Sequence, residues 1–94
     1  MSVAFDTHTL ESAQPVLTSE EMYRRGLAAS IAVTNSRLDL IEAHKWFNLA
    51  AMQGNAEARH YRAELARELS SDEMSEAQRL AREYLSTHAP RIFG

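Results

Sequence analysis

Four histidines and thirteen acidic side chains are the groups in this 94-residue chain that could bind a metal ion or transfer protons. His44 and His60 fall in neighbouring helical segments, whereas His8 and His88 lie near the two ends of the chain. A zinc site needs several ligands that converge, and neither H-E-x-x-H nor a comparable cluster occurs. The sequence therefore predicts no metal site and no cofactor, and it favours surface or capping roles for the histidines.

The most regular spacing of carboxylates is typical of helix starts. In LTSEEM, Thr18 can accept a backbone N–H while Glu21 accepts the N–H of Thr18, which is the pattern of a capping box. LSSDEM repeats this pattern with Ser70 and Glu73. Because capping explains the spacing fully, we expect structural roles for these carboxylates and no acid/base pair.

A third and weaker capping box pairs Asp39 with Glu42, and it predicts a helix that begins near residue 40. The chain has no Cys, which excludes disulfides and a Cys nucleophile. No Gly-rich phosphate loop, nucleotide fingerprint or supported Ser-His-Asp set occurs. The sequence therefore predicts a protein that is not an enzyme.

The composition is that of a globular domain, with 45% hydrophobic residues, 24% charged residues and a net charge of -3. The ten Lys and Arg residues are outnumbered by thirteen Asp and Glu, and no basic block is longer than Arg24-Arg25. A nucleic-acid partner is therefore not expected. No apolar stretch reaches the roughly 18 residues of a membrane span, and MSVAFDTHTL lacks the features of a signal peptide, so we expect a cytoplasmic protein without a membrane partner.

Apolar residues at spacings of three and four predict an all-α fold. The predicted helices cover about residues 19–33, 40–53, 55–69 and 71–87. No segment shows the alternation of a strand, and the short turns predict antiparallel helical hairpins.

The predicted helical domain spans residues 17–88, after a flexible leader (1–16) and before a short tail (89–94). Gly26 interrupts the first helix, which indicates a position that another helix approaches closely. Gly54 is expected to end the second helix in the left-handed conformation, so that the next residue, Asn55, can cap the third.

One segment resembles a known motif. Residues 43–54 fit A-x-x-W-[YF]-x-x-A-A-x-x-G, which is the second half of the Sel-one-like repeat (SLR), a relative of the tetratricopeptide repeat. The positions that carry the resemblance are Tyr23, Gly26, Asp39, Ala43, Trp46, Phe47, Ala50, Ala51, Gly54 and Ala58. AEARHYRAEL would begin a second copy, and the helix at 71–87 resembles a polar terminal cap. The resemblance implies about one and a half SLR-like repeats plus a capping helix.

Members of the SLR family typically hold other proteins in a concave groove. The resemblance thus implies a protein-protein interaction module that acts as an adaptor, scaffold or regulatory subunit. Repeats of this kind bury their apolar faces by stacking, and about three are normally needed for a stable array. We therefore expect the partner to be another protein or a second copy of this chain in a homodimer.

Three side chains are candidates for binding that partner. Trp46 is either a core residue or an exposed anchor. Arg59 and Arg62 alternate with glutamates, which is typical of a solvated ion-pair face, although they could also grip an acidic peptide. The alternative function is a small nucleic-acid-binding regulator that uses the C-terminal helical hairpin, where Arg79 and Arg82 would contact the duplex.

Overall fold

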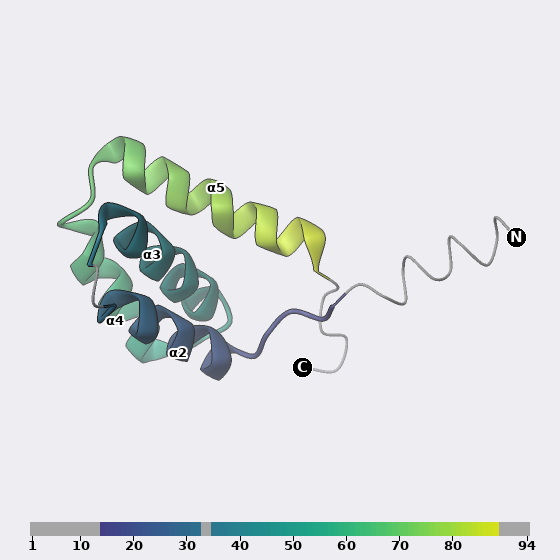
Figure 1. Ribbon diagram of the computed structural model, residues 1–94. Helices are drawn as coiled ribbons and strands as arrows, with labels where there is room; N and C mark the ends of the chain where they lie inside the picture. Colours follow the sequence, from purple (N-terminus) through teal and green to yellow (C-terminus); the bar gives the residue numbers. More distant parts are fainter. Residues whose placement is uncertain (1–13, 33–34, 89–94) are drawn as a thin grey trace, which may run out of the picture.

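The computed structural model describes residues 14–32 and 35–88, and within these ranges the regular structure is entirely helical (Figure 1). The helices are α2 (Ser19–Ser30), α3 (Arg37–Met52), α4 (Ala56–Ala66) and α5 (Ser71–Thr87). The predicted all-α class is confirmed.

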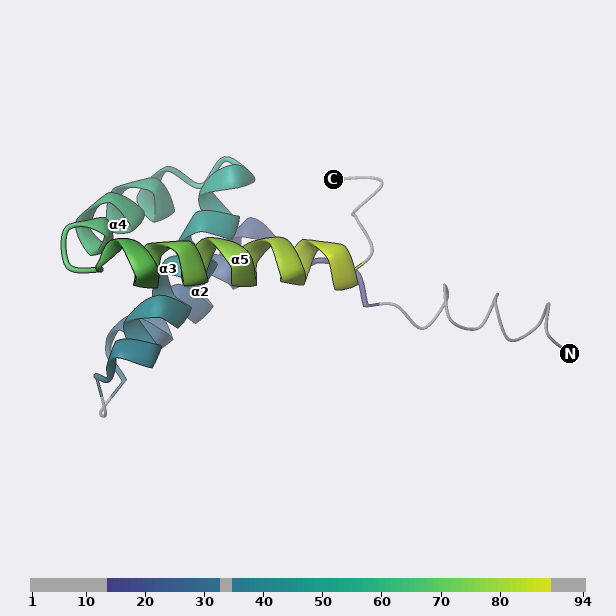
Figure 2. The same cartoon turned by 90° about the horizontal axis from the view of Figure 1, so that it is seen from above.

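Helix α3 lies at the centre of the fold. Helix α5 covers one side of it, while α2 and α4 lie on the other side (Figures 1 and 2). A helix that is apolar on all sides belongs in a core, and the buried side chains of α3 point in every direction around its axis. They are Leu40, Ile41, Ala43, His44, Trp46, Phe47, Leu49 and Ala50.

The last two helices are consecutive in the chain, but they do not pack closely against each other. Helix α5 instead runs along α3, with Ala77, Ala81 and Tyr84 buried on its inner face. Consecutive helices pack extensively in the pairs α2/α3 and α3/α4. The hairpin arrangement predicted from the short turns therefore describes α2, α3 and α4, and α5 covers the central helix.

The predicted start of α3 is wrong. The helix begins at Arg37 because Ser36 is its N-cap: the Ser36 hydroxyl accepts the Asp39 N–H, and the Asp39 carboxylate accepts the Ser36 N–H, both at 3.1 Å. Asp39 therefore closes a capping box and does not begin one. Glu42, the other member of the predicted box, forms an ion pair with Lys45 at 3.6 Å.

The other two predicted capping boxes are confirmed. Thr18 caps α2 with Glu21 as its partner, and Ser70 caps α5 with Glu73 as its partner. Helix α5 has the predicted limits, whereas α2 and α4 end about one turn earlier than the apolar spacing suggested.

The turn between α3 and α4 follows the predicted geometry. Gly54 has a φ of +96°, in the region that side-chain-bearing residues rarely adopt. Asn55 then caps α4, since its side-chain oxygen accepts the Ala58 N–H at 2.8 Å. One left-handed residue followed directly by a cap makes the connection short enough for α4 to pack against α3.

Phe47 joins three helices, and this explains the glycine in α2. A Cβ added at Gly26 would lie only 2.6 Å from Phe47 Cε1, so the aromatic ring occupies the space of the missing side chain. The Phe47 ring also stacks on Tyr61 of α4, with 5.3 Å between centroids, and tilts against Tyr23 of α2 at 6.0 Å. The predicted close approach at Gly26 is confirmed.

Gly26→Ala should lower the free energy of unfolding by about 1–2 kcal/mol. Overpacking costs about 1–3 kcal/mol, and the better helix propensity of Ala recovers no more than about 1 kcal/mol. Urea unfolding followed by circular dichroism measures the change. In a Phe47→Leu background the same substitution should lower the free energy of unfolding by less, because the ring atoms that the new methyl group would meet are gone. Equal costs in the two backgrounds would contradict this explanation.

A polar contact fastens the start of α3 to the start of α5. Arg37 Nε donates to Glu73 Oε2 at 2.8 Å, and Arg37 Nη2 donates to Glu73 Oε1 and to the Glu68 carbonyl oxygen, the latter at 2.9 Å. Glu73 also accepts the Ser70 N–H at 2.9 Å. The hydrogen bond from Arg37, followed by the one from the Ser70 N–H, lowers the pKa of Glu73 from 4.5 to about 2.

This low pKa predicts a specific loss of stability in acid. The unfolded chain takes up the Glu73 proton near pH 4.5, so the stabilisation by this carboxylate is complete above that pH and is lost as the pH falls through about 2. Glu73→Gln should flatten the pH dependence of the urea midpoint in this window. Asp72→Asn, in the same turn, is the matched control and should retain the dependence. Parallel profiles for the protein and Glu73→Gln would refute the assignment.

Candidate binding cleft

The segment before α2 is fastened to the last helix. The Leu17 N–H donates to the Tyr84 hydroxyl oxygen at 2.9 Å, across 67 positions of sequence. Val16 is only 6% exposed and belongs to the core. The predicted flexible leader (1–16) thus reaches into the packed part of the protein at Val16, and its remainder at 1–13 lies outside the described residues.

A cleft of about 380 Å³ opens where this segment meets α2, α3 and α5. Its lining combines aromatic rings, apolar surface and cationic or ionisable groups. The lining residues are Gln14, Pro15, Leu17, Arg25, Trp46, Tyr84 and His88. A second cleft of about 310 Å³ follows α2 and shares Leu17 and Arg25 with the first. The two clefts therefore adjoin each other along the start of α2.

Trp46 contributes an aromatic surface to the first cleft. It is 9% exposed, and its ring meets the Tyr84 ring edge-on at 5.1 Å between centroids. Lys45 Nζ lies 4.3 Å from the centre of the Trp46 ring, and Arg25 Cζ lies 5.3 Å from it, which are cation-π distances. Trp46 is thus a core residue that also lines the cleft.

The charge at the cleft is dominated by Arg25. Its side chain is exposed and forms no ion pair with a carboxylate in the described part of the chain. The neighbouring Arg24 differs, because it pairs with Glu20 at 3.3 Å. No Asp or Glu lines the first cleft. Among the described residues, no carboxylate therefore competes with a ligand for the guanidinium of Arg25.

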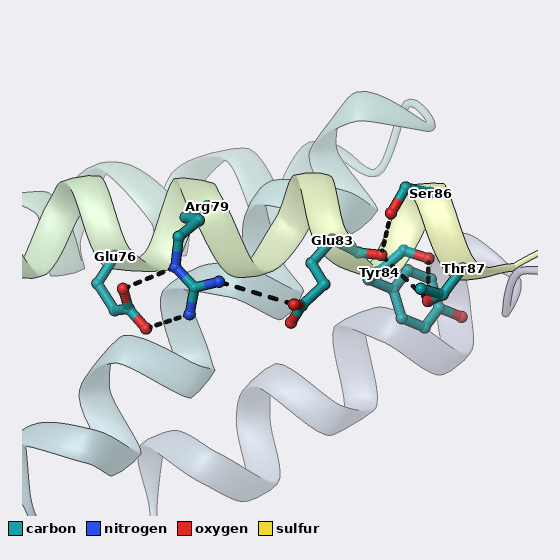
Figure 3. A network of polar contacts seen from close by, with 6 residues as sticks. All are labelled: Glu76, Arg79, Glu83, Tyr84, Ser86 and Thr87. Carbon is teal, nitrogen blue, oxygen red and sulfur yellow. Dashed lines mark hydrogen bonds and ion pairs between the residues drawn. The ribbon is translucent and has the colours of Figure 1, made fainter.

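The final turn of α5 holds Tyr84 in place (Figure 3). The Thr87 hydroxyl donates to the carbonyl oxygens of Glu83 and Tyr84, at 3.0 and 3.2 Å. His88 stacks on the Tyr84 ring at 3.9 Å, and its Nδ1 donates to the Tyr84 carbonyl at 2.8 Å. The bonds to the Tyr84 carbonyl satisfy one of the four carbonyl groups that a helix end leaves without partners inside the helix. The capping role predicted for a histidine is confirmed at His88.

The structure separates the three residues predicted to bind a partner. Trp46 lines the cleft, whereas Arg59 and Arg62 belong to α4 and do not line it. Arg62 Nη1 donates to the Asn48 side-chain oxygen at 2.9 Å, which links α4 to α3. Arg25, which the sequence analysis did not single out, is the arginine that lies beside Trp46 in the cleft.

His44 is buried, so the surface or capping role expected for it is wrong. It is 3% exposed, and within the described structure its Nδ1 has no hydrogen-bond partner. Burial lowers the pKa of His44 below 6.5, and the nearby positive charge of Arg62 lowers it further. The neutral ring is therefore the form that this core accommodates. His60, by contrast, is exposed and its ring meets Tyr61 edge-on at 5.6 Å.

The described residues offer neither a metal site nor a membrane-spanning helix. In residues 14–32 and 35–88, no group of three or more His, Asp or Glu side chains could hold a metal ion. Of the helices in these ranges, none is long and apolar enough to cross a membrane.

Comparison of the chain with protein-family models, with curated proteins and with solved structures finds no match in any of the three.

Tyr84→Phe should cost about 1 kcal/mol of stability, because it leaves the Leu17 N–H without an acceptor. Hydrogen exchange of the Leu17 amide should accelerate beyond the change in global stability, which urea unfolding measures separately. Tyr61→Phe is the matched control, since Tyr61 contributes its ring to the aromatic cluster around Phe47. If the Leu17 amide exchanges equally fast in both variants, the Tyr84 hydroxyl does not hold this segment.

Proposed function

We propose that this protein is a small, non-catalytic protein-protein interaction module that acts in the cytoplasm as an adaptor, scaffold or regulatory subunit. It binds a segment of another protein in the cleft beside Trp46. The observation that carries this proposal is the combination of Trp46, Tyr84 and Arg25, which pairs with no carboxylate of the described residues, around a cavity of about 380 Å³. Trp, Tyr and Arg are the residues that contribute most often to binding energy at protein interfaces.

The chemistry of the cleft supports a binding role over a catalytic one. His88, which lines the cleft, uses its Nδ1 to cap α5, and the Tyr84 hydroxyl accepts the Leu17 N–H. No carboxylate lines the first cleft to orient a base. A nucleophile with an oriented base, as covalent catalysis requires, is therefore missing from these lining residues.

The proposal includes a relationship to the SLR family. Several motif positions have the packing that such a repeat needs: Gly26 receives the Phe47 ring, Gly54 forms a left-handed turn, and Ala43, Ala50 and Ala58 are fully buried. Helix α5 has the character of a terminal cap, because it covers α3 and carries a polar outer face. On this view α2 and α3 form one repeat, and α4 begins the next.

The alternative of a nucleic-acid-binding regulator gains no support from the outer face of α5. Arg79, one of its predicted contacts, is held by Glu76 at 2.7 Å and by Glu83 at 3.7 Å (Figure 3). A positive face for a duplex would need these carboxylates to be absent.

The partner in this proposal can also be a second copy of the chain. Ile31 and Leu38 are large apolar residues that are highly exposed, and such residues can form the contact between two copies.

Affinity capture from the native lysate, read by mass spectrometry with and without nuclease, tests the proposal. We expect a stoichiometric protein partner that resists nuclease and that Gln14→Trp reduces several-fold, because the added indole narrows the cleft. Gln78→Trp on the exposed face of α5 is the matched control and should retain the partner.

Three outcomes would count against this assignment. A partner that binds the Gln14→Trp variant normally would place binding outside the cleft. Loss of the partner on nuclease treatment would favour the nucleic-acid alternative. Recovery of this chain alone, with a dimer mass by light scattering, would show self-association in place of an adaptor function.

A further inference from the structure

We infer that the cleft beside Trp46 binds a short extended segment of a partner protein in which an acidic side chain adjoins an apolar one. This inference rests on the proposed function and specifies its ligand. The carboxylate of the segment pairs with Arg25, and the apolar side chain packs against Trp46 and Tyr84.

Arg25 gives the cleft charge complementarity to an acidic side chain. A guanidinium offers several N–H donors in a planar fork that matches a carboxylate, and the resulting hydrogen bonds are charge-assisted. Arg25 lines both clefts and is without an ion pair to any carboxylate of the described residues. An acidic side chain of a partner would thus form an ion pair with Arg25 that no carboxylate of the described residues forms.

Neighbouring charges favour an anion at the same place. Lys45 Nζ lies 4.3 Å from the Trp46 ring centre and 5.8 Å from the Tyr84 ring centre, which puts a second cation close to the cleft. Glu42 offsets part of that charge through its ion pair with Lys45. Glu21 lines the second cleft, but its carboxylate accepts the Thr18 N–H at 2.8 Å as part of the α2 cap.

The cleft also has apolar surface that suits an apolar side chain of the ligand. Pro15 and Leu17 form apolar surface next to the Trp46 and Tyr84 rings. An aromatic or branched aliphatic side chain would remove this surface from water, which stabilises the complex by about 25 cal/mol per Å². The Arg25 guanidinium lies over the Trp46 ring, with Cζ 5.3 Å from the ring centre, so the acidic and apolar side chains of the ligand have to be close in its sequence.

The two adjoining clefts also set the length of the ligand segment. The two clefts meet at Leu17 and Arg25, and the second continues along α2 from Glu21 to Ala28. At 1.5 Å per helical residue this stretch is about 10 Å long, which about three extended residues would cover. A segment that fills both clefts is therefore longer than three residues, and its carboxylate lies where the two clefts meet, at Arg25.

Peptide binding by the full chain tests the inference. The chain has one Trp, so the fluorescence of Trp46 reports directly on the cleft. The probes are three acetylated, amidated hexapeptides that alternate Leu with Glu, with Gln or with Lys. We expect the Glu peptide to change the Trp46 emission saturably, with a Kd at least about tenfold lower than that of the Gln peptide. Raising the salt from about 0.05 to about 0.5 M should weaken the Glu complex.

Variants of the full chain separate the cleft from general electrostatics. Arg25→Gln should weaken binding of the Glu peptide about tenfold, and Arg25→Lys should have an intermediate effect because it keeps the charge without the fork. Arg82→Gln, on the exposed face of α5, is the matched control and should bind normally. Circular dichroism verifies that each variant is folded.

Equal affinity for the Glu and Gln peptides, or normal binding by Arg25→Gln, would overturn the inference. Absence of binding by all three peptides would overturn it as well. None of these results would by itself refute the proposed interaction module, which the captured partner and the Gln14→Trp variant test separately. Tight binding of the Lys peptide would reverse the charge that we assign to the ligand.

Discussion

The need to surround α3 with protein governs the rest of this structure. Buried residues lie all around the helix, so one neighbour cannot cover them. Phe47 shows how tightly the neighbours must approach, because its ring fills the space beside Gly26 and stacks on Tyr61 of α4. The opposite side of α3 is left for α5. Helices α2, α4 and α5 all contribute to the burial of this one central helix.

The cleft is a consequence of this arrangement. Helices α2 and α5 contact α3 on different sides, and the extended segment before α2 bridges them through the Leu17 to Tyr84 hydrogen bond. Where these three parts meet, Trp46 is covered incompletely and Arg25 reaches across its ring. The same side chain therefore contributes to stability and to the proposed binding surface. Ligand binding there would also restrain the segment that closes the fold.

Local signals in the sequence predicted local structure well. The capping boxes at Thr18 and Ser70 involve residues three positions apart, and Gly54 and Asn55 act on their immediate neighbours. The error at Asp39 shows the limit of such signals. Asp39 can either begin a box with Glu42 or close one with Ser36, and the pattern is acceptable in both registers. The observed choice places Arg37 at the helix start, where it reaches Glu73 of α5.

The sequence by itself determined the helical class, most helix ends and the close packing at Gly26, because these depend on short-range hydrogen bonds and on the space that a glycine leaves. The binding surface was decided only by the tertiary structure. Apolar periodicity marked Trp46 as a buried position, but it could not show which helix would cover it. The arginines predicted to bind a partner, Arg59 and Arg62, lie on α4. Arg25 and Trp46 instead lie close together, because Arg25 precedes Gly26, Trp46 precedes Phe47, and Gly26 packs against Phe47. A contact between residues distant in sequence follows from how whole helices pack, and no local pattern encodes it.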